Sequence, residues 1–162
     1  MQGLDSVFIC MYKYENTPIA CMFERCLYFN VNALSREVNR RWETAFAPLG
    51  ISPAQGYLLR LVLGRPGLMP GEIAQELHLA PSTVTRLVDG LEARGMLERR
   101  AAQSNDERQV AVHPTRASEA LREKLDGTGD ALYREMLRRL GERTVKTLVT
   151  DLRSAKIVLA GR

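Results

Sequence analysis

The chain has 162 residues, of which 45% are hydrophobic and only 6% aromatic, so it can bury one sizeable core in a mainly helical domain. No apolar run reaches the roughly 18 residues that a membrane-spanning helix needs, and no basic stretch followed by an apolar core opens the chain. We therefore expect no membrane span and no signal peptide, and the net charge of +4 is compatible with a nucleic-acid partner.

All the cysteines, namely Cys10, Cys21 and Cys26, lie near the N-terminus. Their odd number and their spacing predict neither a disulfide framework nor a zinc site. Without an export signal, the expected compartment is the reducing cytoplasm. We expect no metal and no cofactor.

Residues 1–20 form an N-terminal arm whose structure the pattern leaves open. A buried strand, an arm packed on a partner subunit and a poorly ordered tail are all compatible with it. Residues 21–65 are predicted to form scaffold helices. A helix from Phe23 to about Phe46 carries an apolar stripe at helical spacing, and Ser52 with Gln55 predicts a capping box at the start of the next helix.

Residues 66–115 contain two short helical patterns followed by two short strand patterns, which are joined by a polar tip at 103–107. This is the order of a winged helix-turn-helix, which places its second helix in the major groove of DNA. Residues 116–162 are predicted to be helical again, beginning at a cap on Thr115. Two glycines, Gly127 and Gly129, predict a kink or break in that segment, because each costs a helix roughly 1 kcal/mol relative to alanine.

The helix expected at 81–94 has an apolar stripe and a polar face. Ser82, Arg86 and Asp89 lie opposite the stripe, and Thr83 and Thr85 flank it. An arginine can bind a guanine edge with two hydrogen bonds, and the hydroxyl groups can contact bases or phosphate. Asp89 can pair with Arg86, three residues away. The alternative is an ordinary amphipathic helix whose polar face is only solvated.

The polar tip between the two predicted strands contains Asp106, and Arg108 directly follows the tip. An arginine at such a tip can enter a narrow minor groove, where the negative potential is strongest. Asp106 can hold it there by a charge-assisted hydrogen bond. The alternative is a surface ion pair of little energetic consequence.

The run PSTVTRLVDGLEARGMLERR, followed by NDER and a valine-rich return strand, closely resembles the MarR family of bacterial transcriptional regulators. The resemblance implies a mainly α fold with a small β-wing, in which the winged helix-turn-helix is flanked by N- and C-terminal dimerisation helices. It implies a homodimer that binds a palindromic operator in double-stranded DNA, with the helix at 81–94 in the major groove and the wing at 103–108 in the minor groove. The DNA-binding positions carried over are Ser82, Thr83, Thr85, Arg86, Asp106 and Arg108.

The resemblance also implies control of DNA affinity, and repression is the expected sign. Many relatives release DNA when a small aromatic or phenolic molecule binds between the dimerisation helices and the winged module. The residues that could line such a pocket here are Trp42, Phe46, Tyr57 and Met69. Other relatives respond to cysteine oxidation, and Cys26 is the candidate for that role. We favour core packing for Cys26, because a free cysteine is usually a small buried residue.

A rival hypothesis from another class is a winged-helix module that binds protein instead of DNA, since that fold has both uses. An enzyme is not expected. The sequence has no recognisable nucleophile with a base, no glycine-rich phosphate loop after a strand, and no metal-ligand spacing. His78 and His113 stand alone in the sequence and are expected to be surface or strand-end residues.

Overall fold

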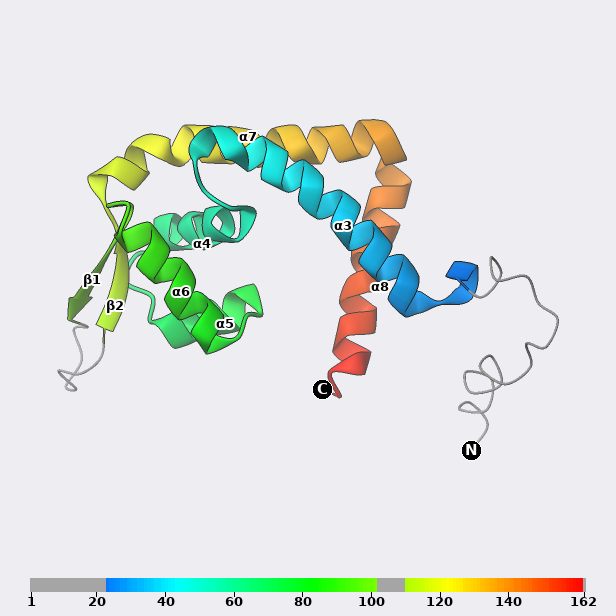
Figure 1. Cartoon of the computed structure of the whole chain (residues 1–162), viewed down its shortest axis with the longest axis horizontal. Helices are drawn as coiled ribbons and strands as arrows, with labels where there is room; N and C mark the ends of the chain where they lie inside the picture. Colours follow the sequence, from blue (N-terminus) through cyan, green and yellow to red (C-terminus); the bar gives the residue numbers. More distant parts are fainter. Residues whose placement is uncertain (1–22, 102–109, 162) are drawn as a thin grey trace. The chain divides into compact units, whose positions relative to one another are not determined.

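The computed structural model describes residues 23–101 and 110–161 (Figure 1). The chain divides after Arg41 into two compact units, and each is described by itself. The first unit contains most of α3 (Leu27–Phe46), and the last turn of that helix belongs to the second unit. The apolar side chains that start the stripe of α3, Leu27, Val31 and Leu34, are exposed.

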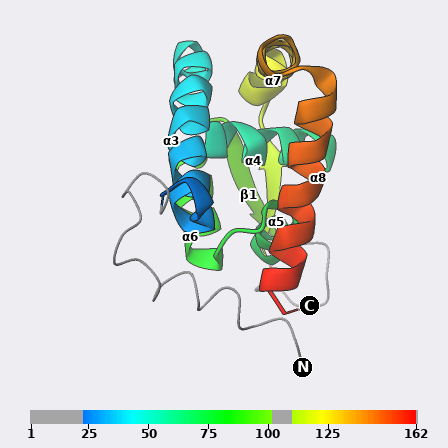
Figure 2. The ribbon, with the colours of Figure 1, turned by 90° about the vertical axis from the view of Figure 1, so that its right-hand side faces the viewer.

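The second unit is built around α4 (Pro53–Gly64), which follows the short helical turn η1 (Ala47–Leu49). The predicted capping box at its start is confirmed, because Ser52 Oγ accepts from the backbone N–H of Gln55 at 3.2 Å and Gln55 Oε1 accepts from that of Ser52 at 3.0 Å. Helix α4 packs against α5 (Pro70–Leu77), α6 (Pro81–Glu92) and α7 (Arg116–Leu140), and it lies between α5 and α7 in both views (Figures 1 and 2).

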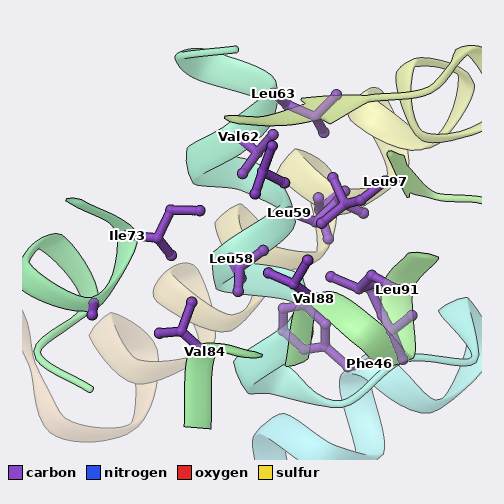
Figure 3. Close-up of a cluster of buried hydrophobic side chains, with 14 of the residues drawn as sticks. Phe46, Leu58, Leu59, Val62, Leu63, Ile73, Val84, Val88, Leu91 and Leu97 are labelled. Atoms are coloured by element: carbon purple, nitrogen blue, oxygen red, sulfur yellow. The ribbon is translucent and has the colours of Figure 1, made fainter. Parts of the chain in front are cut away.

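The hydrophobic core gathers where these helices meet (Figure 3). Its fully buried side chains come from α3, α4, α5, α6, α7 and both strands, and they include Phe46, Leu58, Leu59, Ile73, Val84, Val88, Leu91, Leu97, Val112 and Leu125. The ring of Phe46 lies directly over Gly56 of α4, so closely that a Cβ on Gly56 would overlap it. The short helices α5 and α6 are thus held by burial of their apolar faces, since helices of 8 and 12 residues are marginal on their own.

The sheet consists of β1 (Leu97–Ala101) and β2 (Val110–Pro114), paired antiparallel with Arg99 opposite Val112. Leu68 adds a bridge to the other edge of β2, where the N–H of Val112 donates to Leu68 O at 2.9 Å. The two predicted strands are thus confirmed, on either side of the predicted tip. With α5 and α6 they complete a winged helix-turn-helix, and the turn that joins β1 to β2 lies outside the described residues.

Of the kink or break predicted at Gly127–Gly129, the break is wrong, because α7 runs as a continuous helix of 25 residues through both glycines. Tertiary packing offsets the poor helix propensity, since Leu125 and Leu132 on either side are 1% and 4% exposed. Gly129 also makes room for the guanidinium of Arg60, which pairs with Asp126 at 3.0 Å. The cap predicted on Thr115 is confirmed by its hydroxyl, which accepts the N–H of Ser118 at 3.4 Å.

After Gly141 the chain turns into α8 (Glu142–Leu159), and none of its residues is buried. Its exposed apolar side chains are Leu148, Val149, Leu152, Ile157, Val158 and Leu159. Among the described residues, no helix is long and apolar enough to cross a membrane.

Candidate nucleic-acid interface

Helix α6 is the expected recognition helix, and its position depends on its apolar stripe. Val84, Val88 and Leu91 are fully buried. Pro81 occupies the first helical position, where its missing N–H costs nothing. The predicted helix 81–94 is correct at its start and ends two residues early, at Glu92.

The polar face of α6 is exposed as predicted. Ser82, Thr85, Arg86 and Asp89 are exposed, whereas Thr83 is half-buried beside the stripe. The hydroxyl of Thr85 donates to the carbonyl of Pro81 at 3.1 Å. Thr85 therefore has no proton left to donate to a base, and it offers a methyl group and an acceptor instead.

Arg86 makes no hydrogen bond or ion pair with any residue that the structure describes. The predicted pair with Asp89 does not form, because Asp89 Oδ1 accepts from Arg99 Nη2 at 2.5 Å. Arg99 lies on β1, and its other terminal nitrogen pairs with Glu92 of α6. The guanidinium of Arg86 is thus left available to a ligand, whereas the charge of Arg99 is already balanced.

The pKa of Arg99 is raised, chiefly by the hydrogen bond to Asp89, with partial burial acting in the opposite direction. Sequence reasoning missed this cluster of three residues. Asp89 and Glu92 share one face of α6 because they are three residues apart. Only the pairing of that face with β1 reveals their common partner.

The turn between α5 and α6 depends on His78. This residue ends α5 in the left-handed region, with φ 54°, and is the one residue other than glycine with a positive φ in the described part of the chain. The N–H of Leu79 then donates to Ala74 O at 3.0 Å, which closes the turn. His78 is exposed, as expected of a surface histidine, and the structure gives it a conformational role. His113 is half-buried on β2, beside Gly67.

The wing is described only at its base. The strands place residues 101 and 110 opposite each other. Asp106 and Arg108 lie outside the described residues, so their roles remain predictions from the sequence.

The four residues predicted to line a ligand pocket fall into two places. Trp42 Nε1 donates to Tyr57 Oη at 2.9 Å, and the rings of Tyr57 and Phe46 lie 6.3 Å apart. Phe46 is a core residue with 1% exposure, whereas Tyr57 is 44% exposed. Met69 lies elsewhere, immediately before α5, where its N–H donates to Glu72 at 2.7 Å. A pocket at Trp42 and Tyr57 remains a prediction.

Cys26 is half-buried immediately before α3 in the first unit, and its Sγ accepts the N–H of Phe29 at 3.5 Å. The other two cysteines lie outside the described residues. Within the part of the chain that the structure describes, no group of three or more histidine, cysteine or acidic side chains could hold a metal ion.

Residues 49–109 match the model of the MarR family. No curated protein matches the chain by sequence. Among solved structures, MepR of S. aureus in complex with DNA shares 20% identity at a TM-score of 0.72, over 84% of this chain and 98% of that one. A cysteine-to-serine mutant of MarR from E. coli in complex with operator DNA shares 26% identity at a TM-score of 0.72, over 80% and 92%. CouR of Rhodococcus jostii, bound to p-coumaroyl-CoA, shares 22% identity at a TM-score of 0.68, over 82% and 93%.

Proposed function

We propose that this chain, which its residues 49–109 place in the MarR family of transcription regulators, is a dimeric repressor of a palindromic operator. Helix α6 reads the major groove, and the wing at 103–108 enters the minor groove. The observation that carries the proposal is the exposed row Ser82, Thr85 and Arg86, with Arg86 unpaired among the described residues. The match to the MarR family favours DNA over protein as the partner of that row.

Each side chain of the row makes a different contact with DNA. Arg86 binds a guanine through O6 and N7, for which a planar guanidinium is suited. Thr85 packs its methyl group on a thymine, because its hydroxyl proton is already held by Pro81. Ser82, in the first turn, bonds a phosphate with its hydroxyl, next to the positive end of the helix dipole.

The dimer is inferred from α8. An amphipathic helix of 18 residues with no buried side chain leaves its apolar stripe in water, which a soluble protein avoids by covering it. A second copy of the chain fits best, because two winged modules that are related by a two-fold axis match a palindromic site.

Release by a small aromatic effector completes the proposal. The hydrogen-bonded pair Trp42 and Tyr57 offers flat apolar surface with a phenol group, and such surface suits an aromatic ligand. CouR, which shares the fold, was solved with p-coumaroyl-CoA, and an aromatic acyl group is a reasonable first ligand to test.

The test is selection of duplexes from a random pool, followed by fluorescence-anisotropy titration of the selected duplex at several salt concentrations. We expect selected sites with two-fold symmetry and binding that weakens steeply with salt. The control is Arg86→Lys, which keeps the charge but loses the two-point contact. Failure of the pool to converge on any sequence would refute operator binding and favour the protein-interaction module.

A further inference from the structure

Arg99 on β1 joins two carboxylates of α6. Its Nη2 donates to Asp89 Oδ1 at 2.5 Å, and its Nη1 pairs with Glu92 Oε2. Glu92 also accepts the backbone N–H of Arg99 at 3.3 Å through its second oxygen. The Arg99 clamp, as we call Arg99 with Asp89 and Glu92, therefore holds both the side chain and the backbone of one strand residue.

The clamp also supplies a hydrogen-bond acceptor at the edge of β1 that faces away from β2. On β2, the backbone groups of Val112 bond Gly67 and Leu68, on the side away from β1. Arg99 and Val112 are thus a pair without mutual hydrogen bonds, and the N–H of Arg99 points away from β2. Glu92 supplies the acceptor for that N–H, so α6 is hydrogen-bonded to the strand that leads into the wing.

We propose that Arg99 is a positioning residue for DNA reading, which sets the rotation of α6 about its own axis and thereby the direction of Arg86. This inference rests on the proposed function. Apolar contacts of Val84, Val88 and Leu91 hold α6 but are not directional, so they tolerate small rotations. The forked guanidinium bound to two carboxylates on one helix face is directional. Asp89 lies three residues, roughly 4.5 Å along the axis, from Arg86.

Two other roles for Arg99 make different predictions. If Arg99 itself bound a DNA phosphate, its removal would weaken binding to every sequence. The slope of log affinity against log salt concentration would then fall by the amount expected for about one phosphate contact. Its guanidinium already faces two carboxylates and its side chain is only 29% exposed, which argues against that role. If Arg99 served stability alone, its removal would lower the melting temperature, and the folded protein would still prefer its operator to the same degree.

The test compares Arg99→Gln with the double variant Asp89→Asn/Arg99→Gln, which has the formal charge of the parent protein. Anisotropy titrations measure affinity for the duplex that the unaltered protein selects and for a random duplex of equal length, well below each melting temperature. Thermal unfolding by circular dichroism identifies the folded fraction. Arg99→Lys, which keeps the charge but lacks the fork, is the milder variant if Arg99→Gln fails to fold.

We expect Arg99→Gln to lower the ratio of operator to random affinity roughly ten- to a hundredfold, the effect of losing one base contact, with an unchanged salt slope. The double variant should show the same loss, because restoring the charge does not restore the fork. An unchanged ratio in a folded Arg99→Gln protein, or recovery in the double variant, would overturn the inference while leaving the proposed function intact. An unaltered protein without any operator preference would overturn both.

Discussion

Gly56 and Gly127 allow the same substitution to be tested in two environments of one protein. Gly56 is buried in α4 beneath the ring of Phe46, which is itself only 1% exposed. Gly127 is exposed in α7, and no atom lies within 4 Å of a Cβ placed there. Both positions lie inside helices, so intrinsic helix propensity favours alanine at each by about 1 kcal/mol.

The two alanine variants differ in the steric cost of the added methyl group. At Gly56 a new methyl group would come within 2.7 Å of Phe46 Cδ1, and closer still to Cε1, so the ring must move within a filled core. Overpacking of this kind costs about 1–3 kcal/mol, and the rigid surroundings point to the upper end. Net of propensity, Gly56→Ala should destabilise the protein by about 1–2 kcal/mol, and Gly127→Ala should stabilise it by up to about 1 kcal/mol.

Urea unfolding followed by circular dichroism measures both changes, at one fixed protein concentration because the stability of a dimer depends on it. Gly56→Ala/Phe46→Leu is the matched control, since a smaller side chain at 46 leaves space for the methyl group. The reasoning is refuted if Gly56→Ala is as stable as the parent, or if the two alanine variants change stability by the same amount and in the same direction.

Four further outcomes are expected. Arg86→Ala should cost about 1–3 kcal/mol of operator binding and relax the base preference at one or two positions, which selection with the variant would reveal. Arg108→Ala should weaken binding to all sequences and reduce the slope of affinity against salt, measured by anisotropy. Peroxide should leave operator affinity unchanged, because the Sγ of Cys26 is half-buried and accepts the N–H of Phe29; a loss on oxidation that Cys26→Ser abolishes would assign sensing to Cys26. Leu152→Glu should yield monomers in light scattering where the parent is a dimer, whereas Thr150→Glu, on the opposite face of α8, should not.

The order of elements was predictable because each is encoded locally. The capping box of Ser52 and Gln55 and the prolines at the starts of α4, α5 and α6 act within one turn of helix. The stripe of Val84, Val88 and Leu91 follows from a period of 3.6 residues. The winged helix-turn-helix and the exposed face of its second helix therefore follow from the sequence.

Other features depend on residues that are far apart in the chain. The continuity of α7 through Gly127 and Gly129 depends on packing against α4, and local propensity predicts the opposite. The partner of Asp89 is Arg99, ten residues away on a strand, and not Arg86 on its own helix. Helical spacing shows only which residues share a face, and the fold decides what lies opposite that face. The sequence by itself thus determined which side chains α6 presents, and the tertiary structure decided which of them are free to bind.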